Sequence, residues 1–300
     1  MKNREGKAVD RSVLRQEQEN LHEAVQTVNK TTDQAENADN RNIALTTQKK
    51  SRKRKGRGKY ALITIAVVLL LFFAVFKIYV DNDYEPFHSM ETYRAMTDYE
   101  IVSSDNMIEI SNADAIAKKE AVGFIIYGDE RVQRECYLPL MATLADQGFC
   151  VFLPTTFGNL PFLNQEGAEY VIRSNKAIHT WYIIAHGKAC PAAARYAMSH
   201  ASKINGMIYL GGASYHTDLS QKDIKLLSVM GTLDSTLDAV SVRSAKKNDP
   251  DGAQYLVIEG GNHTGFADTV LMRGDTASTI STSEQIEQTV AAITAFLQAP

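Results

Sequence analysis

The stretch TWYIIAHGKAC (180–190) joins a continuous apolar run to a turn made of small residues. Its first six residues are typical of a β-strand that is buried on both faces. A helix is predicted over residues 189–201, so the strand and the helix are separated by a short turn centred on Gly187. Ala185 and Ala189 flank that centre symmetrically, and such small side chains fit a strand-to-helix turn that leaves little room. The stretch therefore predicts one strand–turn–helix unit of an α/β fold.

The same alternation extends over the C-terminal two thirds of the chain. Six short apolar runs predict strands, at residues 121–127, 149–154, 180–185, 206–212, 224–230 and 254–260. Five segments between or after them predict helices, at residues 134–147, 165–177, 189–201, 237–247 and 282–297. Because the strands are apolar throughout, we expect a doubly wound, mostly parallel sheet with helices on both faces.

A second decisive stretch is YALITIAVVLLLFFAVFKIYV (60–80). Residues 61–76 carry no charge, and Thr64 is their one polar residue. At about 1.5 Å per residue, a helix of this length reaches about 31 Å, which matches the apolar thickness of a bilayer. The run shows no polar face, which argues against a buried core helix. The long preceding region argues against a cleaved signal peptide. We predict a single transmembrane helix of the signal-anchor type.

The charges divide at this span. Residues 1–59 hold 15 Lys and Arg against 8 Asp and Glu, whereas residues 60–300 hold 17 against 27. Eight of the positive charges lie in Lys49–Lys59, directly before the span. The positive-inside rule therefore predicts a cytoplasmic N-terminus and an exterior C-terminal domain in the cell membrane. The basic segment is suited to bind anionic lipids of the bilayer, and without interleaved aromatic residues it does not indicate nucleic-acid binding.

The chain is thus predicted to have four parts: a basic, mostly disordered arm (1–59), the membrane helix (60–80), a membrane-proximal linker (81–104) and an α/β domain (105–300). The arm is polar and contains no aromatic residue, although its leucine and valine spacing permits one short helix around residues 11–29. The three cysteines form no C-x-x-C pair, so a thiolate zinc site is not indicated. No metal and no cofactor are predicted.

Three strand ends carry the residues that suggest chemistry. Gly187 follows the strand of residues 180–185, Asp234 follows the strand of residues 224–230, and His263 lies on a glycine-rich loop after the last strand. Parallel strands bring their carboxyl ends to one edge of a sheet, where such folds bind ligands. A carboxylate there can orient a histidine, and the histidine can act as a general base.

Residues from about 120 to 298 resemble the α/β-hydrolase family, in the small lidless branch related to dienelactone hydrolases and carboxylesterases. Four segments carry the resemblance in addition to the strand ends: 137–140, 193–197, 260–263 and 279–290. The resemblance implies that Asp234 is the acid and His263 the base of a catalytic triad. It places the serine nucleophile of the family at Gly187. It also places the turn that shapes the oxyanion hole at Gly128, Asp129 and Glu130, with Lys188 directly after the nucleophile position.

Glycine at position 187 cannot attack a carbonyl group. It also relieves the backbone strain that a side chain would suffer there. Acidic side chains at positions 129 and 130 would repel an oxyanion if they pointed inward, and would be harmless if they pointed to solvent. The sequence therefore predicts a degenerate hydrolase, a pseudoenzyme that retains an Asp–His pair. Its pocket is expected either to bind a small-molecule or cell-envelope ligand or to serve a structural role.

Two alternatives stay open at this stage. The domain is an active hydrolase of esters or related carbonyl compounds if Ser214 or Cys190 replaces the missing nucleophile, or if His263 activates water. Alternatively, the basic arm is the functional module, which docks acidic lipids or proteins at the membrane.

Overall fold

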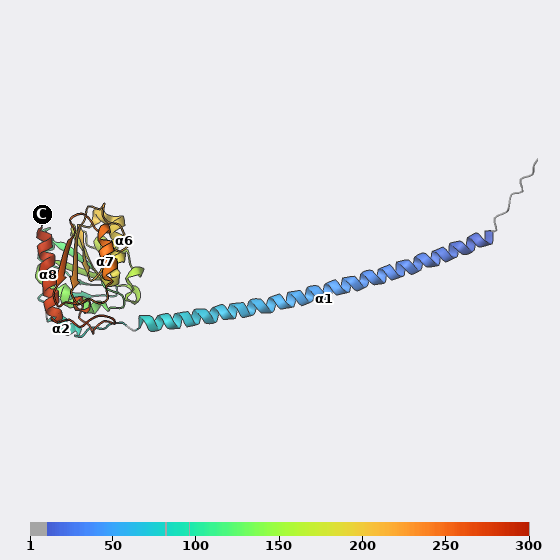
Figure 1. Ribbon diagram of the computed structural model, residues 1–300, viewed down its shortest axis with the longest axis horizontal. Coiled ribbons are helices and arrows are strands. Elements are labelled where there is room, and N and C mark those ends of the chain that lie inside the picture. The colour runs from blue at the N-terminus through green and yellow to red at the C-terminus, as the bar shows by residue number, and fades with distance from the viewer. Residues whose placement is uncertain (1–10, 82, 96, 300) are drawn as a thin grey trace, which may run out of the picture. The chain divides into compact units, whose positions relative to one another are not determined.

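The computed structural model describes residues 11–81, 83–95 and 97–299 of the chain (Figure 1). The chain divides between Val75 and Phe76 into two parts, which are described separately. All described residues of the first part belong to helix α1 (Arg11–Val80), whose last residues reach into the second part. Residues 11–59 are therefore helical, where the sequence led us to expect mostly disorder. The segment contains no proline, and its two glycines, Gly56 and Gly58, weaken a helix without ending it.

The apolar end of α1 agrees with the prediction of one membrane helix. Within the described residues, Lys59–Val80 is the one helical segment long and apolar enough to cross a membrane, with a mean hydropathy of 2.8. Its large apolar side chains are exposed rather than packed, as for Leu70 and Phe73. The segment is therefore not the core helix of a globular domain.

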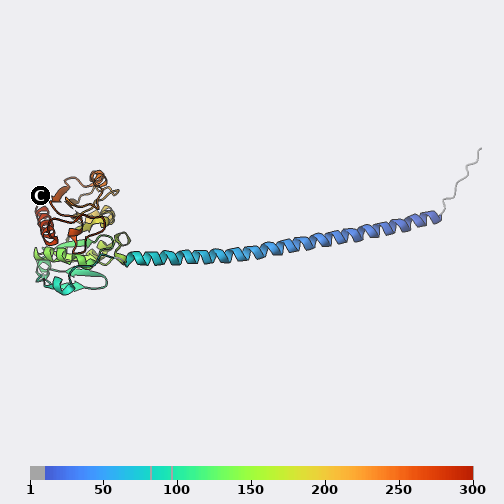
Figure 2. The ribbon, with the colours of Figure 1, turned by 60° about the horizontal axis from the view of Figure 1, so that its bottom comes forward.

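The second part is built on one eight-stranded sheet. Its strands are β1 (Ile101–Ser103), β2 (Met107–Ile110), β3 (Val122–Tyr127), β4 (Cys150–Pro154), β5 (Thr180–His186), β6 (Gly206–Leu210), β7 (Lys225–Gly231) and β8 (Gln254–Ile258). Their order across the sheet is β1-β2-β4-β3-β5-β6-β7-β8. The strands from β3 to β8 are parallel, and β1 and β2 add an antiparallel edge. Figure 2 shows this edge in teal at one side of the domain.

Helices cover both faces of the sheet. They are α2 (Met90–Arg94), α3 (Ala113–Ala117), α4 (Leu138–Asp146), α5 (Gly167–Ser174), α6 (Cys190–His200), α7 (Ala239–Ala245) and α8 (Thr282–Gln298). Figure 1 shows α8 on one face and α6 and α7 on the other. Each face has its own buried apolar layer. Met141 of α4 and Val290 of α8 belong to one layer, and Val171 of α5 and Ala193 of α6 belong to the other. This double covering explains why the central strands are apolar on both sides.

The α/β fold class and its six predicted strands are confirmed, and all five predicted helices are present with shifts of a few residues at their ends. The short strands β1 and β2 were missed because three or four residues give too little pattern to recognise. Part of the expected linker also packs on the domain. Tyr93 of α2 is fully buried and donates a hydrogen bond to Asp268 (Oη–Oδ2, 2.5 Å).

The strand order sets the place of the candidate site. The chain runs from β3 outward to β4 and then returns to β5 on the other side of β3. Such a reversal leaves a crevice at the carboxyl ends of the two central strands, because the following helices leave in opposite directions. The register pairs Tyr127 with Ala185, so the residues just beyond these strand ends, Asp129 and Gly187, lie beside each other.

Candidate active site

His263 and Asp234 meet at the carboxyl edge of the sheet. Asp234 follows β7, and His263 lies in the loop between β8 and η7 (Thr264–Phe266). The Nδ1 atom of His263 is 3.0 Å from Oδ2 of Asp234, and both side chains are almost fully buried. The other oxygen of Asp234, Oδ1, accepts hydrogen bonds from the hydroxyl and the backbone N–H of Thr236. The carboxylate is thus fixed on both sides, and it orients the imidazole.

Gly211, directly after β6, leaves the space that this pair occupies. Its φ of +54° lies in the left-handed region, and a Cβ atom built on it would lie 2.7 Å from Nδ1 of His263 and 2.9 Å from Oδ2 of Asp234. A side chain at this position would therefore be strained and would also displace the pair.

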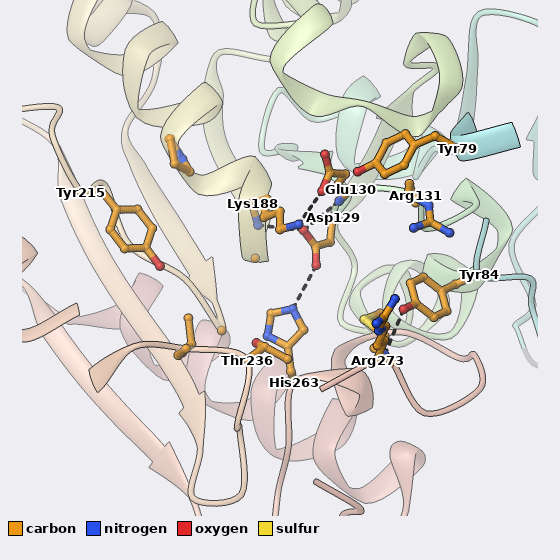
Figure 3. A pocket seen from close by; sticks show the side chains of 15 residues that line it. Tyr79, Tyr84, Asp129, Glu130, Arg131, Lys188, Tyr215, Thr236, His263 and Arg273 are labelled. Carbon is orange, nitrogen blue, oxygen red and sulfur yellow. Dashed lines mark hydrogen bonds and ion pairs between the residues drawn. The ribbon is translucent and has the colours of Figure 1, made fainter. Parts of the chain in front are cut away.

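Asp129 occupies the opposite side of His263. Its Oδ2 atom is 3.0 Å from Nε2 of the imidazole. Its Oδ1 atom accepts two backbone hydrogen bonds of 2.7 Å each, one from the N–H of Glu130 and one from the N–H of Lys188 (Figure 3). The side chain is 9% exposed, so the carboxylate points inward rather than to solvent. Every contact that Asp129 makes here is one that a carboxylate favours, since each partner is a donor.

The two carboxylates determine the charge of His263. Both ring nitrogens face carboxylate oxygens, so both must donate, and the ring is an imidazolium. Burial alone lowers the pKa of His263, but the hydrogen bonds and charges of Asp129 and Asp234 outweigh it and raise the pKa to about 10. Burial likewise raises the pKa values of the two aspartates, and the contact with His263 reverses this and leaves both lowered. The group is a buried Asp–His–Asp triplet with the histidine charged at neutral pH.

Gly187 provides the room in which Asp129 lies. It is the first residue of η4 (Gly187–Ala189), directly after β5, and its φ is +53°. A Cβ atom built on Gly187 would lie 2.5 Å from both Cγ and Oδ2 of Asp129. No side chain can therefore occupy position 187 while the Asp129 carboxylate keeps its place.

A second histidine, His186, lies beside the first at a ring-centroid distance of 4.5 Å, with the two ring planes tilted by 31°. Its Nε2 atom faces the carbonyl oxygen of His263 at 3.2 Å and must donate, so its Nδ1 atom accepts from the hydroxyl of Tyr137 at 2.9 Å. That hydroxyl in turn accepts the backbone N–H of Asp129. Burial and the nearby charge of His263 lower the pKa of His186 to about 4, so this ring is neutral. It supports the loop of Asp129 rather than supplying a base.

The remaining predicted site residues are engaged elsewhere. Ser214 is buried, and its hydroxyl donates to Asp249. The thiol of Cys190 donates to the carbonyl of Ala185, and burial raises its pKa well above the usual range, which keeps it protonated and unreactive. Gly128 packs against the ring of Tyr137. The side chain of Lys188 is at the surface, where its ammonium group pairs with Glu130 at 2.5 Å.

Asp129, His186 and His263 lie close enough together to suggest a metal site. Their donor atoms are already committed, however. Both nitrogens of His263 donate to carboxylates, both nitrogens of His186 have partners, and Oδ1 of Asp129 accepts two backbone N–H groups. A metal ion would have to deprotonate His263 and break these bonds, so the arrangement fits an ion-pair network better than a metal centre.

A cavity of about 450 Å³ opens beside the triplet. Asp129 and His263 lie at its inner wall, and side chains of mixed polarity form the rest, including Tyr79, Tyr84, Arg131, Tyr215, Leu237, Met272 and Arg273 (Figure 3). Arg131 lies over the ring of Tyr79, with its Cζ atom 4.8 Å from the ring centroid. The cavity is large enough for a small organic molecule.

Comparison with known proteins places the domain in a family. The sequence profile described as "Alpha/beta hydrolase family" matches residues 123–287, and the chain belongs to this family. No curated protein sequence matches the chain significantly.

Solved structures to which the chain is similar include the following three. Est1E from Butyrivibrio proteoclasticus is 12% identical, with 67% of this chain and 99% of that chain covered and a TM-score of 0.49. A predicted CIB-like hydrolase from Thermoplasma acidophilum is 12% identical, with 65% and 97% covered and a TM-score of 0.45. A dienelactone hydrolase from Anabaena variabilis is 10% identical, with 56% and 88% covered and a TM-score of 0.44.

Within this family, the backbone N–H after the nucleophile and an N–H from the loop after the β3-equivalent strand bind the oxyanion of the reaction. By chain position, the N–H groups of Lys188 and Glu130 would correspond to these donors, and both donate to Oδ1 of Asp129. The sequence indicated an acidic residue near this turn but left its direction open. The inward direction of the Asp129 side chain could have been inferred only from the register of β3 against β5, which sets Asp129 beside Gly187.

The charge of His263 predicts a pH dependence of stability. Because the pKa of His263 is raised from 6.5 to about 10 on folding, the folded chain holds a proton that the unfolded chain releases between these values. We expect the unfolding free energy to fall as the pH rises from about 7 to 10, and this slope to be smaller in His263→Gln. Denaturant titrations of the unmodified chain and of His263→Gln at several pH values measure the slope of the unfolding free energy against pH. Equal slopes in the two chains would contradict the assignment of an imidazolium.

Proposed function

We propose that this chain is a membrane-anchored member of the α/β-hydrolase family that does not hydrolyse esters and uses its cavity to bind a ligand. The observation that carries the proposal is the position of the Asp129 carboxylate. It accepts hydrogen bonds from the two backbone N–H groups that the family uses for the oxyanion, and it contacts the catalytic-type histidine at 3.0 Å.

Three requirements of acyl transfer are unmet in this arrangement. Position 187 offers no nucleophilic atom. His263 is already protonated, so it has no lone pair with which to accept a proton from water or a hydroxyl group. The donors for a developing oxyanion are occupied by an anion, and a second negative charge at that place would be repelled. Together these features favour binding without turnover.

The ligand that suits the cavity is a small molecule or a cell-envelope component with both apolar and polar groups. Arg131, Arg273 and the Lys188–Glu130 ion pair bring charge to the lining, and Leu237 and Met272 offer apolar contact. Such a lining recognises an amphipathic compound through a few polar contacts and apolar burial.

The apolar segment and the charges before it support the proposed membrane anchoring of the chain and its orientation. The segment Lys59–Val80 is apolar enough to cross a bilayer, and the basic run Lys49–Lys59 precedes it. On the positive-inside rule, the N-terminus lies in the cytoplasm and the domain outside, with the basic run at the anionic lipids of the inner surface.

The alternative, an active hydrolase in which His263 activates water, is favoured by the intact hydrogen bond between Asp234 and His263. An ester assay separates the two. We expect the full-length chain in detergent to hydrolyse short-chain p-nitrophenyl esters no faster than His263→Gln does. Turnover that is lost in both His263→Gln and Asp234→Asn would establish the active hydrolase and refute our proposal.

A further inference from the structure

The loops around the start of the domain carry large apolar side chains that the fold leaves in solvent. Six of them are at least half exposed: Phe87, Phe157, Phe162, Leu163, Val270 and Leu271. We call these six residues the apolar loop patch. They come from three separate segments, namely the chain just after α1, the loop after β4 and the loop after β8. Both of these loops follow the carboxyl ends of their strands, so they share the edge of the sheet on which the candidate site lies.

Contacts of the chain between Val80 and Phe87 hold these segments together. The side chain of Val80 lies against Gly158, in the turn η2 (Phe157–Asn159). Further along, Asp83 accepts a hydrogen bond of 2.5 Å from Asn159. The loop after β4 is therefore fixed to the residues that immediately follow the apolar helix.

The loop after β8 is fixed to the same stretch of chain. Pro86 forms a β-bridge with Thr269, and the hydroxyl of Thr269 donates to the carbonyl of Glu85 at 2.7 Å. The backbone N–H of Arg273 donates to the hydroxyl of Tyr84 at 2.9 Å. Val270 and Leu271 thus lie between two anchored points of this loop.

We propose that the apolar loop patch rests in the interfacial layer of the lipid bilayer, a proposal that builds on the membrane anchoring inferred above. If the span ends at Val80, that residue lies at the membrane surface, and Val80 itself contacts the loop of Phe157. Apolar side chains that are fixed next to the end of a span are stabilised when they move from water into the boundary between the lipid headgroups and the acyl chains. Exposed apolar side chains gathered on segments that are tied together in this way indicate an interaction site.

Other large exposed apolar residues of the domain do not gather in this way. Val102 on β1, Tyr170 on α5, Met198 on α6 and Val240 on α7 belong to separate elements, and Tyr255 and Val257 form a pair on the edge strand β8, which none of the others joins. Single exposed apolar residues are normal on protein surfaces and need no partner. The bilayer is therefore the occupant that the patch fits, since it is the apolar phase to which the neighbouring residues are covalently tied.

The cavity opens beside the same segments. Tyr79, Tyr84 and Arg273 line it, and they belong to the chain around the end of α1 and to the loop after β8. If the patch rests on the bilayer, ligands reach the cavity along the membrane surface. The ligand class is then an amphiphile that partitions into the interface, such as a lipid, rather than a freely diffusing polar solute.

Tryptophan scanning in vesicles tests this docking. Full-length chains with Phe157→Trp or Val240→Trp are reconstituted into phosphatidylcholine vesicles with and without brominated acyl chains. Bromine quenches only a tryptophan that lies within the lipid. We expect Phe157→Trp to lose at least half of its added fluorescence and to emit at shorter wavelength, and Val240→Trp to change little. The native Trp181 is buried in the core and adds the same background to both.

Controls separate the possible failures. Alkaline carbonate washing shows whether the chain is integral to the vesicle, and release into the wash would refute the anchoring on which the proposal rests. If the chain stays in the membrane but Phe157→Trp and Val240→Trp are quenched equally little, the docking proposal is wrong while the anchoring stands. Leu271→Trp repeats the test in the other loop and replaces Phe157→Trp if circular dichroism shows that this variant misfolds.

Discussion

A chain that carries both Asp129→Gly and Gly187→Ser is expected to react with a fluorophosphonate probe, whereas each single substitution leaves labelling close to background. The first substitution removes the carboxylate from the N–H groups of Glu130 and Lys188 and from Nε2 of His263. The second supplies a hydroxyl at the turn after β5. His263 would then keep only Asp234 as a partner, which lowers its pKa and lets it act as a base.

We expect the rate of labelling in the double variant to exceed that of either single variant on the order of a hundredfold or more, since the oxyanion donors and the nucleophile appear together. Gly187→Ser alone should fail for a steric reason, because its Cβ atom would lie 2.5 Å from the Asp129 carboxylate at a φ of +53°. The backbone strain alone costs about 1–3 kcal/mol of stability. Adding His263→Gln to the double variant is the control, and labelling that survives it would contradict the assigned roles.

Removal of the His263 side chain is expected to give the largest loss of stability among single substitutions in the site. In His263→Ala, the carboxylates of Asp129 and Asp234 stay buried without the cation that lies between them. Breaking a buried ion pair by removing one partner costs about 3–5 kcal/mol. Urea titration at pH 7 measures this as a shift of the unfolding midpoint.

Two further variants identify the cause of the loss. His179→Ala changes an exposed histidine and should alter the unfolding free energy by no more than about 0.5 kcal/mol. Adding Asp129→Asn to His263→Ala removes one of the two stranded charges and should recover part of the stability. If the double variant is no more stable than His263→Ala alone, the loss of stability comes from the space that the missing imidazole leaves rather than from unpaired charge.

The fold was predictable because its strands are apolar along their whole length and its helices follow at regular spacing. This pattern needs only local sequence, and it identified β3 to β8. The pairing of Asp234 with His263 was also predictable, because both residues directly follow parallel strands and such residues meet at one edge. The sequence of α1 was less informative, because a polar segment without packing partners gives no periodic signal for a helix.

The position of the Asp129 side chain was not predictable in the same way. It depends on the pairing of β3 with β5, which brings together residues 58 positions apart, and on the space beside a glycine with a positive φ. The sequence suggested that an inward carboxylate would harm catalysis. It did not reveal that the carboxylate would take the donors of the oxyanion and hold the histidine in its charged form. That result depends on the hydrogen bonds of one loop, which no local pattern encodes.

The close fit between the α-carbon of Gly187 and the Asp129 carboxylate also couples the two positions. A serine at position 187 does not fit while the acid stays, and a glycine at position 129 alone leaves position 187 without an attacking group. A single exchange at either position is therefore either unfavourable or without benefit to catalysis. We expect the two positions to covary in related sequences, so that a side chain at 187 accompanies a smaller residue at 129.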